Sequence, residues 1–319
     1  MDVSVLITTY YHEKYIAQAL DSVLAQKTDY SFDIIVADDC SKDNTVDIVK
    51  NYQKKYPDKI KFIANKKNMG IPKNIYQGRC ACDGRYIIHL SGDDYWIDDN
   101  KIQAMISFLD AHHEYIIACN KTEIRHGDST VCQEVLPDKK FCNRTYSLED
   151  YEKGIYPQMH GFAIRNVYKD EKLQKYLYQS QIISDKVDDE VDVVLFLMLG
   201  DFYVLDILTD VYRIPEDKKN SHNYNSVFNY YEIDKQEIDI LNKMYKKWGD
   251  KIDFRKIYVY HLSMAIAHML KDKNKGNRSQ YRKLISSVPS EYKKTWFGGV
   301  IGQSYKRLFT NKMRNVFSK

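Results

Sequence analysis

The sequence predicts an α/β protein with a mostly parallel sheet and flanking helices, followed by a C-terminal helical region. Two observations predict the sheet. Through the first hundred residues, short apolar runs alternate with segments whose apolar residues recur at helical spacing, and polar clusters follow these runs. Strands that alternate with helices form parallel sheets that helices cover on both faces. A third observation, helical spacing from residue 232 onward, predicts the helical region.

The first ninety residues supply four strands of this sheet. Val3 begins a short apolar run, and from Ile16 onward apolar residues recur three and four positions apart. Asp43 and Asn44, which are good capping residues, precede the second helical segment. We therefore expect strands at 3–7, 32–37, 60–64 and 86–90, and helices at 16–24, 46–52 and 74–81.

The next part of the chain continues the pattern less regularly. Asp98 or Asp99 caps a predicted helix, and Ser147 with Asp150 has the spacing of a capping box. A polar stretch in between predicts a hairpin or an excursion from the sheet. We expect a helix at 101–112, a strand at 115–124, the polar stretch at 125–143, an acidic-start helix at 189–199, strand pieces at 202–213 and a polar loop at 215–224.

Composition fits a globular enzyme. The chain has 319 residues, 44% of them hydrophobic and 29% charged, which suits one large domain or two smaller ones. No apolar run approaches the roughly 20 residues that cross a bilayer, and no secretory signal is recognisable. Six cysteines without the spacing of a metal site favour reduced thiols. We therefore expect a cytoplasmic protein.

The charge is distributed unevenly. Residues 271–319 contain 13 Lys and Arg against two acidic residues, so this segment has a net charge of about +11. Since the whole chain has a net charge of +4, the rest carries about −7. Within residues 293–319, large apolar residues fall on one helical stripe and basic residues lie off it. Such a helix lies on an anionic membrane surface or packs on protein. We expect the membrane, and hence a peripheral position on the inner face of the cell membrane.

Polar clusters follow four of the predicted strands, and one cluster contains adjacent carboxylates, Asp93 and Asp94. In α/β sheets, ligands bind beyond the carboxyl ends of the strands. Hard divalent cations prefer oxygen ligands, so this pair is suited to hold a cation against a phosphorylated ligand. The alternative is an acidic surface turn. Four polar strand ends favour the ligand site; they are 8–10, 38–41, 65–70 and 91–94.

Several motifs occur in order along the chain: VSVLITTYYHEKYI, DIIVADDCSKDNT, NKKNMGIPKN and SGDDYW, then VDDEVDVVLFLMLGDFYVLDILTDVYRI. Together they resemble the family 2 glycosyltransferases of the GT-A fold. The resemblance covers about residues 1–214. It implies an inverting enzyme that uses a nucleotide-activated sugar and a divalent metal, Mn²⁺ or Mg²⁺. The implied division is nucleotide-sugar binding at about 1–95, the acceptor side at about 96–214, and a helical region at 215–319.

The resemblance also assigns roles to individual residues. Asp189 aligns with the catalytic base when the alignment is anchored on Tyr212-Arg213, and a shift of one position would select Asp188 or Glu190 instead. The resemblance also implies that Thr8 and Tyr10 contact the nucleotide and that Asp39 accepts a hydrogen bond from the base N–H. Lys73 is implied to approach the diphosphate, Asp93 to hold the ribose or sugar, and Asp94 to bind the metal.

The sequence departs from the family pattern at three positions. Tyr11 replaces a common Asn, and Cys40 replaces a common Gly, so that turn either has no positive φ or holds a strained residue. Pro215 stands where a His is frequent, which leaves His222 as a substitute contact in the predicted loop.

The expected function is transfer of a sugar from a nucleoside-diphosphate sugar, by default a UDP-sugar, to a hydroxyl of a glycan or lipid-linked acceptor in bacterial surface-polysaccharide synthesis. A sugar nucleotidyltransferase is one alternative, although Thr8-Thr9-Tyr10 lacks the Gly-rich basic loop of that class. A non-catalytic glycan-binding module is another. We expect no nucleic-acid partner, because no recognition motif accompanies the basic tail.

Overall fold

The computed structural model describes residues 1–127, 129–156, 161–184, 189–214, 229–271, 275–289 and 292. The chain divides into two compact units. Unit 1 comprises Met1–Leu148 and Tyr156–His222, and unit 2 comprises Glu149–Ile155 and Asn223–Lys319.

Unit 1 is built on a ten-stranded sheet within its described part, in the order β3-β2-β1-β4-β9-β6-β10-β5, with β7 on β6 and β8 on β10. Strands β3, β2, β1 and β4 all pair in parallel, whereas the second half of the sheet is mixed. The predicted α/β sheet is therefore confirmed. The strands are β1 Val3–Thr9, β2 Phe32–Asp38, β3 Ile60–Ala64, β4 Tyr86–Ser91, β5 Tyr95–Trp96, β6 Tyr115–His126, β7 Glu134–Leu136, β8 Arg144–Tyr146, β9 Gly161–Arg165 and β10 Asp201–Ile214.

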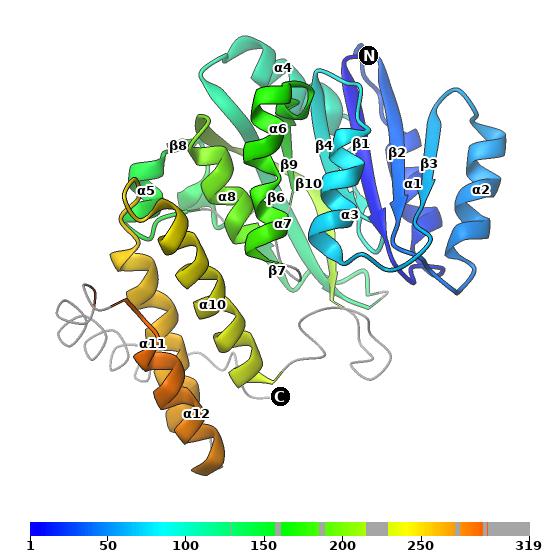
Figure 1. Cartoon of the computed structure of the whole chain (residues 1–319). Coiled ribbons are helices and arrows are strands. Elements are labelled where there is room, and N and C mark those ends of the chain that lie inside the picture. Colours follow the sequence, from blue (N-terminus) through cyan, green and yellow to red (C-terminus); the bar gives the residue numbers. More distant parts are fainter. Residues whose placement is uncertain are drawn as a thin grey trace. The chain divides into compact units, whose positions relative to one another are not determined.

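Helices cover both faces of the sheet (Figure 1). Val3, Val5 and Ile7 of β1 share one core with the buried sides of α1 and α4. On the other face α3 approaches β1 so closely at Gly78 that a β-carbon there would lie 2.5 Å from Leu6 Cδ1. The helices are α1 Ile16–Leu24, α2 Thr45–Lys55, α3 Ile71–Cys80, α4 Lys101–Ala111, α6 Glu171–Leu177, α7 Gln179–Ile183 and α8 Asp189–Leu197, with the short 3-10 turns Lys139–Phe141 and Val167–Lys169.

Most predicted elements are present with ends that differ by a few residues, and the polar stretch after β6 is a hairpin, since β7 pairs antiparallel with β6. The strand pieces expected at 202–213 form one long strand, β10, with register shifts. The antiparallel strands β5 and β9 and the helices α6 and α7 were not predicted. The loop expected at 215–224, with His222, lies outside the described residues.

Unit 2 contains α10 Tyr230–Trp248, α11 Arg255–Lys271 and α12 Lys275–Ser286, and it takes up most of α5 Leu148–Glu152, so the predicted helical region is confirmed. Buried Asp234 of α10 accepts a hydrogen bond from Tyr281 of α12 (3.0 Å), and its Oδ2 lies 2.8 Å from His268 Nδ1 of α11. One carboxylate thus joins three helices. The amphipathic helix expected at 293–319 lies outside the described residues. Among the helices that are described, none has the length and apolarity to span a bilayer.

Candidate functional site

The structure brings the polar ends of four parallel strands to one edge of the sheet. Thr9 of β1 pairs in register with Asp38 of β2, and Thr8 pairs with Ser91 of β4. The chain beyond each strand stays close, since Asp39 N donates to Thr9 O (2.9 Å) and Gly92 N to Thr8 O (2.8 Å). In Figure 1 this is the lower edge of the sheet, opposite the end at which β1 begins.

Asp93 and Asp94 follow β4 at this edge. Asp94 is half-buried, and its Oδ1 accepts a hydrogen bond from the backbone N–H of Arg213 at 2.8 Å. Burial, and next the charge of Asp93, raise the pKa of Asp94 well above its usual value. Asp93 Oδ2 lies 3.9 Å from Nε2 of His12, and the side chains of His12 and Asp93 are 18% and 17% exposed. The strand end therefore holds two neighbouring carboxylates, and the charge of Arg213 only partly offsets the effects of burial and of Asp93 on the pKa of Asp94.

Arg213 fixes the backbone of this turn from β10, although sequence reasoning used it only as an alignment anchor. The side chain is 4% exposed and donates to the carbonyl oxygens of Asp93 and Gly127, the latter at 3.2 Å, and to Gln18 Oε1 at 2.6 Å. The guanidinium group also lies over the ring of Tyr15, 4.4 Å from its centroid. Its partners are far apart in the sequence, so only the fold reveals this role.

The residues around Gly92 fit a divalent cation and a polar ligand. Two adjacent carboxylates are the oxygen donors that Mg²⁺ or Mn²⁺ prefers. Thr9 Oγ1 and His12 Nδ1 are buried, with no hydrogen-bond partner among the described residues. Both lie close to the backbone of Gly92, where a β-carbon would be 3.0 Å from Thr9 Oγ1 and 2.9 Å from His12 Nδ1. Unpaired buried polar atoms beside a carboxylate pair are typical of a binding site.

Asp39 is 4% exposed and orders the loop that precedes α3. Its Oδ1 accepts from Met69 N (2.7 Å) and Asn65 Nδ2 (3.2 Å), and its Oδ2 accepts from Gly70 N (2.9 Å). Lys73 follows as an exposed residue in the first turn of α3. The carboxylate assigned to the nucleotide base thus also shapes the loop that leads to the lysine assigned to the diphosphate.

Two non-glycine residues at this edge have left-handed backbone conformations. Tyr11 has φ 60° and Cys40 has φ 69°, so the turn after Asp39 holds a strained residue, the second of the two expectations for Cys40. Ser41 joins the two turns, since its Oγ accepts from Tyr11 N at 2.9 Å and its N–H donates to Asp38 at 2.9 Å. The ring of Tyr10 is half-buried and stands edge-on to that of Tyr11 at 4.6 Å.

Thr8, His89 and Trp96 also have defined places. Thr8 Oγ1 lies 2.9 Å from His89 Nε2 in β4. Burial lowers the pKa of His89 to about 3, so the imidazole is neutral. Trp96 is 4% exposed and belongs to the core.

Asp189 is the exposed first residue of α8, and Glu190 beside it is half-buried. Helix α8 packs against β6 and β10, and β10 is the strand that holds Asp94 through Arg213. Gly200 connects the carboxyl end of α8 to the start of β10. A β-carbon on Gly200 would lie 3.3 Å from Cβ of Ile116, which is near the start of β6. The amino end of α8 therefore points toward the edge where the strands end. Asp188 lies outside the described residues.

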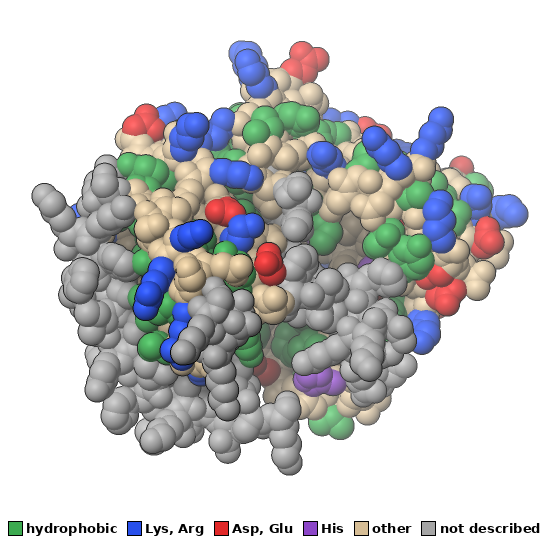
Figure 2. Space-filling view, turned by 60° about the horizontal axis from the view of Figure 1, so that its bottom comes forward, with side chains coloured by type: hydrophobic (Ala, Val, Ile, Leu, Met, Phe, Trp, Pro, Cys, Tyr) green, Lys and Arg blue, Asp and Glu red, His purple; other side chains and the backbone are tan. Residues whose placement is uncertain are grey.

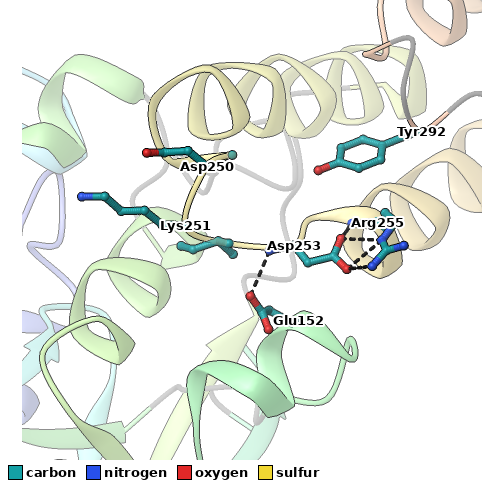
Figure 3. A pocket seen from close by; sticks show the side chains of 8 residues that line it. Glu152, Asp250, Lys251, Asp253, Arg255 and Tyr292 are labelled. Carbon is teal, nitrogen blue, oxygen red and sulfur yellow. Dashed lines mark hydrogen bonds and ion pairs between the residues drawn. The ribbon is translucent and has the colours of Figure 1, made fainter.

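A hollow of about 520 Å³ in unit 2 differs chemically from this edge (Figure 3). Asp253 accepts from Arg255 Nε at 2.7 and 2.9 Å, and its own N–H donates to Glu152 at 2.9 Å. Asp250 and Lys251 lie on the other side of the hollow, and Tyr292 borders it. Its central carboxylate thus pairs directly with an arginine side chain, whereas Asp94 accepts from the backbone N–H of Arg213.

Relatives with similar sequences include proteins described as glycosyltransferases and proteins described as uncharacterized. A Mycobacterium bovis protein described as uncharacterized is 32% identical over 134 residues, 42% of this chain and 39% of its own length. The Staphylococcus aureus poly(ribitol-phosphate) beta-N-acetylglucosaminyltransferase TarS is 33% identical over 121 residues, 37% of this chain and 20% of its own length. This chain therefore spans less than two fifths of these relatives.

Solved structures resemble the whole fold. TarS 1-349 in complex with UDP-GlcNAc superposes with a TM-score of 0.53 at 18% identity, covering 90% of this chain and 91% of that one. The mannosyltransferase PcManGT of Pyrobaculum calidifontis, in complex with GDP-Man and Mn²⁺, gives 0.52 at 13% identity, with 97% and 87% covered. These likenesses confirm the GT-A type of fold. The profile of Glycosyl transferase family 2 matches residues 4–170, more than half of the 319 residues, and the chain belongs to that family.

Proposed function

We propose that the protein is a metal-dependent inverting glycosyltransferase that moves a sugar from a nucleoside-diphosphate sugar to a hydroxyl of a glycan or lipid-linked acceptor in surface-polysaccharide synthesis. The observation that carries this proposal is the pair Asp93 and Asp94, held at the strand edge by Arg213 beside unpaired buried polar atoms. UDP is favoured as the nucleotide because TarS was solved with UDP-GlcNAc.

The donor binds at the edge formed by residues 1–95. Tyr10 stacks on the base, and Asp39 accepts a hydrogen bond from the base N–H while keeping Met69 and Gly70 in place. Lys73 approaches the diphosphate, and Asp93 holds the ribose or sugar. Thr8 lines the nucleotide side of β1. Asp94 would hold Mn²⁺ or Mg²⁺, which when bound stabilises negative charge on the leaving diphosphate.

Asp189 is the general base of the proposed reaction. Its carboxylate takes the proton of the acceptor hydroxyl while the acceptor oxygen bonds to the anomeric carbon and the bond from that carbon to the diphosphate oxygen breaks. A base on the face opposite the leaving group gives a single displacement and inversion, by the same facial logic that separates inverting from retaining glycosidases. Residues 96–214 shape the acceptor side, and residues 215–319 form the separate helical region.

The test incubates the protein with Mn²⁺, glycan acceptors and a panel of nucleotide sugars, and measures the nucleoside diphosphate released. Transfer with release of a nucleoside diphosphate is expected. A parallel incubation with nucleoside triphosphates and sugar 1-phosphates, in which pyrophosphate release is measured, would instead indicate the nucleotidyltransferase. No turnover in either incubation would indicate the glycan-binding module. Asp189→Asn should lower the transfer rate roughly 10²–10⁴-fold and leave donor affinity unchanged. A wild-type rate in that variant would exclude Asp189 as the base.

A peripheral, cytoplasmic position on the inner membrane face is also part of this proposal, and it rests on the basic sequence of residues 293–319. The full chain should sediment with anionic phospholipid vesicles and not with neutral ones. Replacing Lys306, Arg307, Lys312 and Arg314 together by Gln should abolish sedimentation. Figure 2 shows Lys and Arg side chains interspersed with other side chains over the face that it draws. Nucleic acid is not a proposed partner, because no recognition motif accompanies the basic tail.

A further inference from the structure

A buried ion pair joins two helices on one face of the sheet in unit 1. Arg79 lies in the last turn of α3, and Asp192 lies in the first turn of α8, 113 positions later in the chain. Arg79 NH1 donates to Asp192 Oδ2 at 2.5 Å and to the hydroxyl of Tyr168 at 2.9 Å. The two charged side chains are only 4% and 8% exposed. Phe196, one turn further along α8, places its ring centroid 5.5 Å from the guanidinium carbon.

Burial of this kind is a poor way to gain stability. The cost of removing two charges from water often exceeds their attraction, so an apolar pair of similar volume stabilises a fold equally well or better. The desolvation is visible at Asp192, whose pKa is raised by burial and lowered by Arg79. What an ion pair adds is a fixed relative orientation of its two side chains, because the N–H groups of a guanidinium donate to a carboxylate only within a narrow range of geometries. The contact is therefore better explained by positioning than by stability.

The two helices that it joins begin at the two halves of the proposed site. The amino end of α3 follows Met69 and Gly70, which bind to the carboxylate of Asp39 on the donor side. The amino end of α8 is Asp189, three positions before Asp192 and hence about one helical turn away along the helix. A constraint on Asp192 therefore fixes both the rotation and the position of the turn that carries Asp189.

We infer that Arg79 and Asp192 are positioning residues that hold the first turn of α8, and with it Asp189, in register with the donor side of the sheet. This inference rests on the proposed function, because it gives Arg79 and Asp192 a role only if Asp189 reacts. Neither residue contacts substrate. Their loss should slow the chemical step and leave donor binding intact, since the hydrogen bonds described for Asp39 and Asp94 come from residues outside α8.

The experiment uses the double variant Arg79→Met/Asp192→Leu in the full chain, with thermal unfolding, calorimetry of UDP binding with Mn²⁺, and steady-state transfer kinetics. We expect a Tm close to that of the wild type, a UDP Kd within about twofold, an unchanged donor KM, and a kcat about 10²-fold lower, the effect of misplacing a reacting group by about 1 Å. Wild-type kcat in the folded double variant would overturn the inference, and so would a loss of UDP binding as large as the loss of kcat.

A milder variant keeps the test decisive if the double variant does not fold. Arg79→Lys retains the charge without the forked geometry, and it should lower kcat less than tenfold with KM unchanged. A folded Arg79→Lys variant with wild-type kcat would then overturn the inference. Arg85→Ala, which removes an exposed arginine paired with Asp2 and Asp110, is the matched control and should keep the wild-type kcat. Asp189→Asn is measured in parallel: full activity there refutes the base itself, and the positioning role falls with it.

Discussion

A pair of consecutive aspartates lies at the end of each of the two strands that flank β1. The carboxylate oxygens of the two pairs differ in their hydrogen-bond partners. Asp38-Asp39 ends β2, and Asp93-Asp94 follows β4, so both pairs come to the same edge of the sheet. Within the first pair, the protein itself supplies several hydrogen-bond donors. Within the second, the described residues supply Asp94 with the backbone N–H of Arg213, and the His12 imidazole lies 3.9 Å from Asp93.

The first pair builds loops. Asp38 is fully buried and accepts from the N–H and the hydroxyl of Ser41, while Asp39 accepts from Met69 N and Gly70 N. Such bonds organise the chain on which a ligand rests. At the second pair, Asp94 accepts from the backbone N–H of Arg213, and burial raises the pKa of Asp94. The same dipeptide thus serves structure in one place and is suited to a cation in the other, and the number of donors around each pair decides which.

The largest expected effect comes from Asp94→Ala. If the second pair holds the cation, this variant should lose metal-dependent UDP binding and lower transfer roughly 10³-fold or more, because a catalytic metal supplies several kcal/mol of charge stabilisation. Calorimetry with and without Mn²⁺ measures the binding. Asp83→Ala, at an exposed carboxylate paired with Lys61 and Lys169, is the control and should behave as wild type. If UDP binding to the Asp94→Ala variant still responded to Mn²⁺, Asp94 would not be the metal ligand and the two aspartate pairs would not differ in this role.

A smaller effect is expected from Asp39→Ala. The N–H of Met69 loses its acceptor, and the N–H of Gly70 keeps only Asn68 Oδ1, which should cost about 1–3 kcal/mol of unfolding free energy and weaken UDP binding about tenfold. Denaturant unfolding and UDP titration measure the two quantities. The response to Mn²⁺ should persist, since Asp94 is intact. Unchanged stability in Asp39→Ala would show that the first pair does not organise its loop.

In metal-free protein, replacing Asp94 by Asn should raise the thermal stability, whereas replacing Asp39 by Asn should lower it. A carboxyl whose folded-state pKa lies above its unfolded value destabilises the fold once pH exceeds the unfolded value, and this penalty is complete above the folded pKa. Asp94→Asn should therefore raise Tm by about 2–4 °C at pH 8, and by less as pH falls toward 4. Asp39→Asn should lower Tm. A Tm gain for Asp94→Asn that does not shrink toward acid pH would contradict this account.

The sequence predicted the parallel half of the sheet because each strand there is a local apolar run that ends in polar residues. It did not predict β9, whose place between β4 and β6 depends on contacts far along the chain. Gly161 opens that strand where a β-carbon would lie 1.7 Å from Asp210 Oδ2, so any larger residue there would displace this buried side chain. Likewise the motif located Asp93 and Asp94, but not Arg213, whose acceptor Gln18 is 195 positions away. Local sequence patterns predict which polar residues lie at the strand ends, whereas the contacts among those residues depend on the tertiary fold.

The smallest expected effect tests the backbone beneath the second pair, through Gly92→Ala. The added methyl group would lie 2.9 Å from His12 Nδ1 and 3.0 Å from Thr9 Oγ1, so the His12 ring must move away. We expect a loss of about 1 kcal/mol of unfolding free energy and a donor KM raised several-fold, with kcat unchanged. Gly200→Ala, which is also tight but meets Ile116 at 3.3 Å far from the strand edge, should lose stability without a change in KM. An equal change in KM for both variants would mean that the contacts of Gly92 serve packing alone.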